Sequence, residues 1–520
     1  MEKYIIRPIT RIILVLGILL SGCNDDFLER ELQSELLTDS YYKDNTECQN
    51  ALIGVYDVLN INDQYYGSPS GGGSFFRGLL VVGNIGTDEC IVERPFWMGD
   101  HNNIEYYLTN PSTDLIYLIW RNMYLGISRA NTLLARIPES DNATEQADLE
   151  RIRGEAFFLR GLFYWHLVKF YGGVPLITKE IKTPDDIVYE RSSIVKTYEQ
   201  IISDLGMAIE LLDYKLGGNY ASKGAAEAFL GLVYLQMCGP QVNNNNNTAG
   251  QAAEALRSVM NNSGFRLLNN YADIYKLTNE NNDEIIFNIE FSDLPSEYGQ
   301  LTAYFGPGNQ SITNSYHILH SSEEHFYSYD TVNDARWSHN VAAYEIKVSN
   351  NEYVIEPTSR EDPLNDYFVN KFRLPLPENT SEGYPYLEWQ SPLNYPVLKF
   401  SDVLLLYAEA ECRANNGPTN DAYDAINRIR NRAGLNDLTP GLDYDTFMAS
   451  LLQERSWELC FEGKRWEDLV RFGKLVETVK GLTSTNPLGA VNIRDHHIFM
   501  PIPQIEITLS KNVLEQNDGY

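Results

Sequence analysis

The most regular apolar pattern in the chain lies in the segment ERIRGEAFFLRGLFYWHLVKFYGGVP at 150–175. Its apolar side chains recur at steps of three and four residues, which places them on one face of an α-helix: Ile152, Ala156, Leu159, Phe163, Leu167 and Phe170. Gly172, Gly173 and Pro175 then end the helix, because glycine and proline interrupt a helical backbone. A helix with such an apolar stripe has to bury it against other elements of the chain.

Further helical patterns follow, and they come in pairs. The paired segments are 46–59 with 115–137, 150–175 with 193–213, 222–237 with 252–265, and 402–417 with 420–435. Small residues such as Ala225, Ala228 and Ala408 recur at helical spacing, where two helices must approach closely. Helix pairs with a period of about 34 residues are typical of tetratricopeptide units. We therefore predict a mainly α fold, with four divergent tetratricopeptide-like pairs as its scaffold.

Two long stretches interrupt the helical pattern. Residues 60–114 and 266–400 are rich in Tyr, Asn, Pro and Gly, and they contain only short strand-like pieces such as DEIIFNIEF at 283–291. Irregular segments of this length in a compact protein are usually functional, and large aromatic side chains on loops suggest a recognition surface. We predict that a loop-rich, short-strand-containing region carries the ligand site.

The N-terminus has the features of an export signal with an anchor. Three basic residues precede an apolar run at 12–20, which is too short to span a bilayer and suits a cleaved signal peptide. The residues LSGC at 20–23 resemble the lipobox of bacterial lipoproteins, in which the cysteine is acylated. We predict a signal peptide over 1–22, lipid attachment at Cys23 and an extended leader over 23–45.

The net charge narrows the range of partners. The chain carries a formal charge of −30. So acidic a protein repels nucleic acid and anionic membrane surfaces. It suits a neutral or a cationic ligand better than an anionic one.

One segment offers an enzymatic alternative. Three glutamates, Glu454, Glu458 and Glu462, recur at four-residue intervals in the segment ERSWELCFEGKRWEDL at 454–469. They suggest a glycoside hydrolase, because glycoside hydrolysis uses a pair of carboxyl groups. Basic residues interleave with these acids, and large apolar side chains share what we predict to be a single helix. The basic residues are Arg455, Lys464, Arg465 and Arg471, and the apolar ones are Trp457, Leu459, Trp466 and Leu469. This mixture favours salt-bridged packing of an amphipathic helix over catalysis.

Other motifs for catalysis, cofactors or metals are absent from the sequence. HSSEEH at 320–325 does not match the zinc-protease patterns, and His496 and His497 fall in a predicted strand, which would direct their side chains to opposite faces. There is no G-x-S-x-G elbow, P-loop or GxGxxG motif. There is no EF-hand loop either, so the adjacent acids Asp88 and Glu89 are the remaining candidate for calcium binding. We predict a protein that is not an enzyme and that uses no cofactor or metal.

Seven motifs, in order along the chain, resemble the SusD/RagB family. They are the lipobox, RGEAFFLRGLFYWHLVKFYGGVPL (153–176), NENNDEIIFNIEF (279–291), LLLYAEAECRANNG (404–417), INRIRNRAGL (426–435), ERSWELCFEGKRWEDLVRFGKL (454–475), and FMPIPQIEI with NVLEQNDGY (499–520). The resemblance covers essentially the whole chain. It implies an N-terminal SusD-like region over 46–265, a loop-rich insertion over 266–400, and a C-terminal region over 401–520 with the fourth helix pair and a terminal helix.

The family resemblance also implies a function. It indicates a nutrient-binding lipoprotein on the outer face of the outer membrane, which passes an oligosaccharide, or less often a peptide, to a SusC-like TonB-dependent transporter. A surface glycoside hydrolase and a structural, tetratricopeptide-type assembly lipoprotein are the alternatives.

The ligand candidates are aromatic and polar residues of the two irregular stretches. Aromatic rings stack on the CH-rich faces of sugars, while polar side chains bind the hydroxyl groups. In the family, the first irregular stretch carries part of the glycan site, although this chain departs there from the usual Gly-Asp-Trp pattern. The candidates are Arg77, Trp97, Asp100, His101 and Asn102 from the first stretch, and Tyr304, Trp337 and Trp389 from the second.

Overall fold

The computed structural model describes residues 41–520, apart from 61–77, 93–98, 188, 215–218, 243–244, 293, 295–298, 307–317, 343, 350–351, 358–366 and 375–390. The predicted signal peptide, Cys23 and the leader up to residue 40 lie outside the described residues. Within the described ranges, no helix combines the length and the apolar character needed to cross a membrane.

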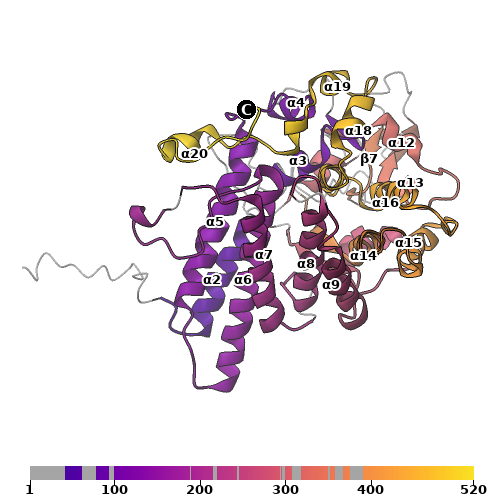
Figure 1. The fold of residues 1–520 in the computed structure, drawn as a ribbon. Helices are drawn as coiled ribbons and strands as arrows, with labels where there is room; N and C mark the ends of the chain where they lie inside the picture. The colour runs from indigo at the N-terminus through magenta and orange to yellow at the C-terminus, as the bar shows by residue number, and fades with distance from the viewer. Residues whose placement is uncertain are drawn as a thin grey trace, which may run out of the picture.

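The predicted helix pairs form the scaffold of the molecule. They are α2 (Asn45–Asn60) with α5 (Asp114–Arg136), α6 (Ala143–Tyr171) with α7 (Ile194–Leu211), α8 (Lys223–Cys238) with α9 (Ala249–Asn262), and α14 (Phe400–Ala414) with α15 (Asn420–Ala433). The two members of each pair pack against each other, and successive pairs pack in chain order (Figure 1). The prediction of a mainly α fold built on four helix pairs is confirmed.

Helix α6 is longer than its apolar pattern. It begins at Ala143, where the side chain of Asn142 accepts hydrogen bonds from the backbone N–H groups of Thr144 and Glu145. Such a cap satisfies N–H groups that have no partner within the helix. The helix ends at Tyr171, and the next residue is Gly172, whose φ of 71° favours a residue without a side chain.

Small residues lie where neighbouring helices approach most closely, both within a pair and between pairs. A Cβ atom added to Gly126 on α5 would lie 2.4 Å from the ring of Phe163 on α6. In the third pair, a Cβ added to Gly231 on α8 would lie 2.5 Å from Leu256 on α9. The spacing between these helices therefore depends on glycine as well as on the alanines noted in the sequence.

Replacing Gly126 with alanine is expected to lower the free energy of unfolding by about 1–3 kcal/mol, because the new methyl group overpacks the interface between α5 and α6. Gly206→Ala is the matched control: a Cβ at Gly206 on α7 would meet no atom within 4 Å, so the better helix propensity of alanine should raise stability by about 0.5–1 kcal/mol. Urea denaturation of both variants tests this, and equal effects would contradict the packing argument.

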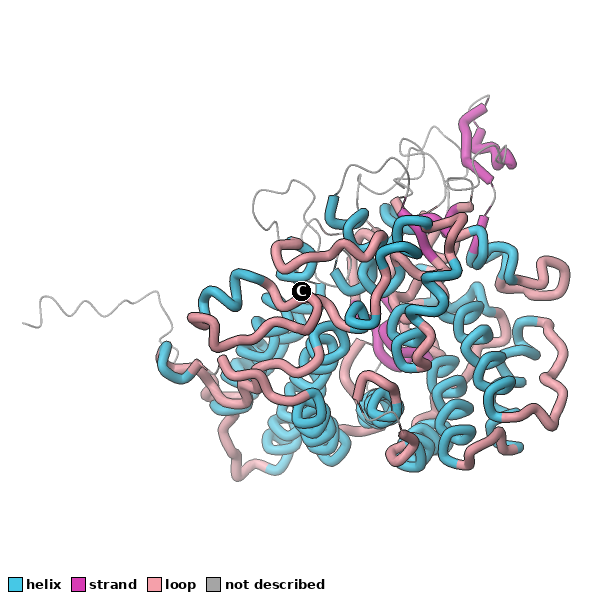
Figure 2. The backbone as a smooth tube through the Cα atoms, turned by 45° about the horizontal axis from the view of Figure 1, so that its top comes forward, coloured by secondary structure: helices cyan, strands magenta, loops and turns pink. Residues whose placement is uncertain are grey.

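The other half of the molecule is built mainly from short elements. Its helices are α3 (Val81–Asn84), α4 (Gly99–Glu105), α10 (Leu301–Phe305), α12 (Glu323–Ser328), α13 (Trp337–Asn340), α16 (Tyr444–Leu459), α17 (Arg465–Arg471), α18 (Leu475–Gly481), α19 (Pro487–Asn492) and α20 (Gln504–Leu509). Its strands are β1 (Cys90–Val92), β2 (Ile285–Ile289), β3 (Leu319–Ser321), β4 (Val341–Ala342), β5 (Tyr344–Ser349), β6 (Glu352–Pro357), β7 (Phe368–Val369) and β8 (Tyr395–Lys399). In Figure 2, the strands and many of the loops lie over the long helices of the scaffold.

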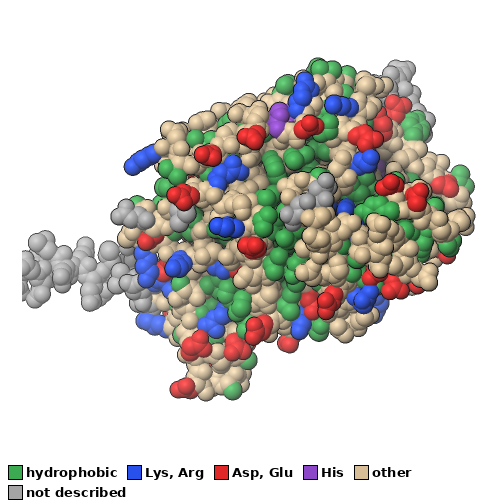
Figure 3. All heavy atoms as spheres, in the orientation of Figure 1, with side chains coloured by type: hydrophobic (Ala, Val, Ile, Leu, Met, Phe, Trp, Pro, Cys, Tyr) green, Lys and Arg blue, Asp and Glu red, His purple; other side chains and the backbone are tan. Residues whose placement is uncertain are grey.

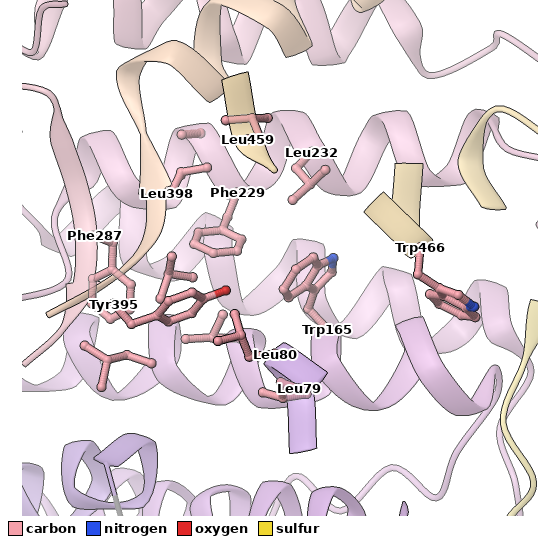
Figure 4. Close-up of a cluster of buried hydrophobic side chains, with 14 of the residues drawn as sticks. Leu79, Leu80, Trp165, Phe229, Leu232, Phe287, Tyr395, Leu398, Leu459 and Trp466 are labelled. Atoms are coloured by element: carbon pink, nitrogen blue, oxygen red, sulfur yellow. The ribbon is translucent and has the colours of Figure 1, made fainter. Parts of the chain in front are cut away.

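One continuous core joins the two halves. Strands β2 and β8 pair antiparallel, with Ile289 opposite Tyr395, and β2 packs against α8. The ring of Phe287 on β2 lies edge-on to Phe158 of α6, with 5.0 Å between the ring centroids. Figure 4 shows Phe287 and Tyr395 beside Phe229 of α8 in this cluster. The irregular half is therefore fixed to the scaffold by buried aromatic packing.

Candidate ligand-binding site

Five of the eight ligand candidates can be placed in the structure. Asp100, His101 and Asn102 lie on α4, Tyr304 lies on α10, and Trp337 begins α13. The other three candidates, Arg77, Trp97 and Trp389, lie outside the described residues.

A small sheet gathers the elements that carry these five residues. Four strands pair antiparallel in the order β1-β3-β7-β4. Helix α4 contacts β1, α10 contacts β3, and α13 runs directly into β4. Segments that are far apart in the sequence are thus collected around one sheet.

Within this group, two predicted residues contact each other. The rings of His101 and Tyr304 are stacked, with centroids 6.1 Å apart and an angle of 22° between the planes. Both side chains are buried, with exposed fractions of 0% and 2%. Their packing joins α4 to α10, and neither ring is exposed to a ligand in this arrangement.

Asp100 has a structural contact that the sequence did not reveal. Its Oδ2 accepts hydrogen bonds from the backbone N–H groups of Asp114, at 3.1 Å, and Leu115, at 3.4 Å. These groups open helix α5, where a carboxylate is favourable because the N–H groups lack partners within the helix. No local pattern predicts this contact, since the carboxylate and the helix belong to different segments.

Asn102 and Trp337 keep partly exposed side chains. Trp337 packs edge-on against Phe326 of α12, with 5.8 Å between ring centroids. Among the described candidates, these two side chains are best placed to reach a ligand from α4 and α13.

The glutamates that suggested catalysis are buried in ion pairs. Arg336 Nη1 lies 2.7 Å from Glu454 Oε1 and 3.2 Å from Glu458 Oε2, and Lys371 Nζ lies 2.6 Å from Glu462 Oε1. All five side chains are 0% exposed. A catalytic acid or base must reach a substrate, and these carboxylates are enclosed by cations instead. The arrangement supports the salt-bridge interpretation of this segment.

The partners in these pairs differ from the expected ones. Three of the interleaved basic residues bind acids other than the three glutamates: Arg455 pairs with Asp468, Arg465 with Asp88, and Arg471 with Glu409. Lys464 alone of the four lies near one of them, with 3.6 Å between its Nζ and Glu462 Oε2. The glutamates therefore bind mainly to cations brought by other segments, which the spacing along one helix cannot reveal.

The prediction of a single helix through this segment is also wrong. Helix α16 ends at Leu459 and α17 starts at Arg465, and between them Phe461 and Gly463 have φ values of 63° and 71°. The break lets helix α3 approach: a Cβ added to Gly83 would lie 2.3 Å from the carbonyl oxygen of Gly463. The turn is fixed by the N–H of Gly463, which donates to Asn84 Oδ1 at 3.1 Å.

The calcium candidates Asp88 and Glu89 are engaged by a cation from the protein. Arg465 Nη2 lies 2.6 Å from Asp88 Oδ2, and Arg465 Nε lies 3.8 Å from Glu89 Oε1. Burial raises the pKa of Glu89 to about 8, despite the nearby guanidinium. Among the described residues, no group of three or more His, Cys, Asp and Glu side chains is placed to hold a metal ion.

Glu89→Gln is expected to raise the free energy of unfolding at pH 8 and to leave it nearly unchanged at pH 4. A glutamate ionises near pH 4.3 in the unfolded chain, whereas Glu89 keeps its proton up to about pH 8 in the fold. Its contribution to stability is therefore complete below about pH 4.3 and is lost as the pH rises through 8. Urea denaturation from pH 4 to pH 9 measures the difference, and parallel curves for the two proteins would contradict the assignment.

The neighbouring histidines His496 and His497 do not lie in a strand, contrary to the prediction. They occupy a 3-10 helix over Asp495–Ile498, and their ring centroids are only 4.1 Å apart. The turn forms because His497 Nδ1 accepts a hydrogen bond from the backbone N–H of Arg494 at 2.8 Å. His325, from the HSSEEH segment, is buried and hydrogen-bonded to Ser456 Oγ at 3.3 Å.

Comparison with known families assigns the fold. A sequence profile described as the SusD family matches residues 239–520, which is more than half of the chain. The chain belongs to the SusD family. A second profile, described as starch-binding associating with outer membrane, matches residues 87–235, so the two SusD-type matches follow one another along the chain.

Individual SusD-family proteins match over almost their full length. SusD-like protein P25 of Formosa agariphila is 26% identical over 95% of this chain and 96% of its own. The crystal structure of a SusD homologue from Bacteroides thetaiotaomicron, also 26% identical, has a TM-score of 0.80 and covers 94% of this chain and 100% of its own. Surface glycan-binding protein A of the same species, in complex with laminarihexaose, is 19% identical, with a TM-score of 0.72, and covers 91% of this chain and 99% of its own. The predicted SusD-like fold is confirmed.

Proposed function

We propose that this SusD-family protein is a non-enzymatic lipoprotein on the outer face of the outer membrane, which binds an oligosaccharide and delivers it to a SusC-like TonB-dependent transporter. The observation that carries the proposal is the gathering of α4, α10 and α13 around one small sheet. It brings together candidate residues from both irregular stretches. A structural relative that holds laminarihexaose supports the choice of a glycan as ligand.

Binding would combine stacking with hydrogen bonds. The indole of Trp337 offers a flat apolar face, and the amide of Asn102 both donates and accepts hydrogen bonds, as sugar hydroxyl groups require. Arg77, Trp97 and Trp389 lie outside the described residues and stay predicted ligand contacts. Buried His101 and Tyr304 would act by holding α4 against α10.

The surface charge also fits a neutral ligand. The chain has a net charge of −30, and on the face shown in Figure 3 acidic side chains are spread among basic ones. No strong local attraction for anions arises from such a mixture. Anchoring through a lipid on Cys23 would keep this acidic body at the membrane, because several acyl chains together bind a bilayer stably.

Titration of the purified protein with oligosaccharides tests the proposal. Malto-, laminari-, cello- and xylo-hexaoses, with a peptide library as the alternative ligand class, are measured by isothermal titration calorimetry. Trp337→Ala and Asn102→Ala are each expected to weaken binding of the preferred glycan by about tenfold, the effect of losing one important contact. Leu509→Ala, at an exposed position on α20, is the control and should bind as the natural protein does.

Two further measurements test delivery of the glycan to a transporter and the absence of catalysis. A TonB-dependent transporter is expected to co-purify with the protein from outer membranes, and the bound glycan should be recovered uncleaved after prolonged incubation. Absence of binding to the whole panel together with absence of a co-purifying transporter would refute the proposal. Glycan cleavage that is abolished by Glu458→Gln would instead favour the hydrolase.

A further inference from the structure

We propose that a second cleft, between the end of α2 and the β2–β8 sheet, also binds a neutral oligosaccharide. The cleft has a volume of about 610 Å³, within the range of roughly 300–1,000 Å³ found for ligand pockets. None of its lining residues belongs to α4, α10 or α13. The inference shares only its class of ligand with the proposed function and depends on different residues.

One wall of the cleft is a fixed pair of tyrosines. The hydroxyl group of Tyr56 donates to Glu155 Oε2 at 2.6 Å and accepts from the backbone N–H of Ala221 at 2.8 Å. The ring of Tyr56 then lies edge-on to Tyr220, with 6.1 Å between the centroids. Tyr220 remains 42% exposed. An exposed ring held in place by its neighbour is a surface on which a sugar ring can stack.

The opposite wall presents a buried acceptor. Asn288 on β2 is only 3% exposed and lines the cleft. Its Nδ2 donates to Asn281 Oδ1 at 3.0 Å, while its Oδ1 has no hydrogen-bond donor among the described residues. A buried polar atom without a partner is unfavourable, and a ligand hydroxyl group would supply the missing hydrogen.

Further acceptors and amides line the same cleft. Glu280 and Glu290 line the cleft together with Asn394. The N–H of Asn394 donates to Glu280 Oε1 at 3.1 Å, and Asn281 Nδ2 donates to Glu290 Oε1 at 3.0 Å. These contacts hold both carboxylates in place. Phosphate, sulfate or uronate groups would be repelled here, whereas the hydroxyl groups of a neutral sugar can donate to the carboxylates.

The aromatic wall distinguishes a sugar from a cation as the occupant. A divalent cation needs a shell of oxygen ligands and gains nothing from an exposed tyrosine ring. Within the described residues, no cluster of three or more acidic, His or Cys side chains is placed for a metal ion. Stacking on one wall and hydrogen-bond acceptors on the other are the two features that sugar recognition combines.

Amide hydrogen exchange, measured on the whole mature chain in detergent, tests the inference. It reports protection separately for peptides of the second cleft and for peptides of the first site. The probes are malto-, laminari-, cello- and xylo-hexaose, with oligogalacturonate as the charged counter-probe. A neutral hexaose is expected to slow exchange in peptides covering 53–60, 219–221 and 285–292, and oligogalacturonate is not. If protection is confined to α4, α10 and α13 (99–105, 301–305 and 337–340), the second cleft does not bind the glycan. The proposed function is then unaffected. Absence of protection with every probe would overturn the second cleft, and the proposed function would then be decided by the peptide library and by co-purification of a transporter.

Variants then assign the protection to the cleft. Tyr220→Ala is expected to weaken binding there by about tenfold, and Asn288→Leu by at least as much. Tyr444→Ala removes a half-buried tyrosine that is not part of the cleft and should leave the protection unchanged. Because Tyr220 is well exposed, its variant keeps the test valid even if Asn288→Leu folds poorly. Protection that survives both cleft variants, or that disappears when EDTA is added, would overturn the proposal.

Discussion

Replacing Arg336 with methionine is expected to lower the free energy of unfolding by about 3–5 kcal/mol, the cost of removing one partner from a buried ion pair. The guanidinium binds three carboxylates, with its nearest contacts 2.7 Å from Glu454, 2.8 Å from Asp334 and 3.2 Å from Glu458. Its side chain is 0% exposed. Without it, buried negative charges would lose a shared counter-charge and could not regain water.

Urea denaturation at pH 7 measures this loss, and a surface pair provides the control. Arg266 pairs with Asp283, but its side chain is 71% exposed. Arg266→Met should therefore change stability by less than about 1 kcal/mol, because water screens exposed pairs. Similar losses in the two variants would show that the buried network is not the source of the effect.

Acid is expected to unfold the protein steeply below about pH 4.3, where glutamates become protonated in the unfolded chain. Burial alone would raise the pKa of Glu458, but Arg432 and Arg336 outweigh it and hold that pKa below its usual value. Burial would also raise the pKa of Glu462, but Lys371 and Lys399 outweigh it and lower that pKa. A carboxylate with a lowered pKa stabilises the fold above its unfolded pKa, and this contribution is lost as the pH falls through the folded value.

Urea denaturation at pH 7, 5, 4 and 3 tests the prediction. Repeating it in high salt separates the two possible causes of acid unfolding, which are repulsion between surface charges and protonation of the buried glutamates. Repulsion between surface charges is screened in 1 M salt, whereas buried pairs are screened much less. The acid-induced loss of stability should therefore persist at high salt. A free energy of unfolding that stays constant from pH 5 to pH 3 would contradict the assignment of these glutamates as ionised in the fold.

The scaffold could be predicted because its helices carry an apolar period of their own. The pattern in 150–175 leads directly to the long helix α6. The start of that helix was missed, because residues 143–148 carry no large apolar side chain and the first buried residue is Leu149. This first part of α6 projects into solvent and therefore has no apolar stripe. In the sequence, its start is indicated only by the capping residue Asn142.

The candidate site could be predicted only in part. Sequence composition directed attention to the two irregular stretches, and the structure places candidates from both around one sheet. The strands of that sheet are two or three residues long, too short to show an alternating pattern. Which segments pair there depends on hydrogen bonds between distant parts of the chain. The second cleft was missed for the same reason, since Tyr56, Tyr220 and Asn288 come from three separate segments.

The sequence by itself determined the helix pairs and the family, because periodic burial and ordered motifs are local properties of a chain. Only the tertiary structure decided which charges pair, where the helix near residue 460 breaks, and which aromatic rings remain exposed. Burial and ion pairing depend on neighbours that folding brings from elsewhere. The three glutamates at four-residue intervals therefore show their buried counter-charges, which come mainly from other segments, only in the folded protein.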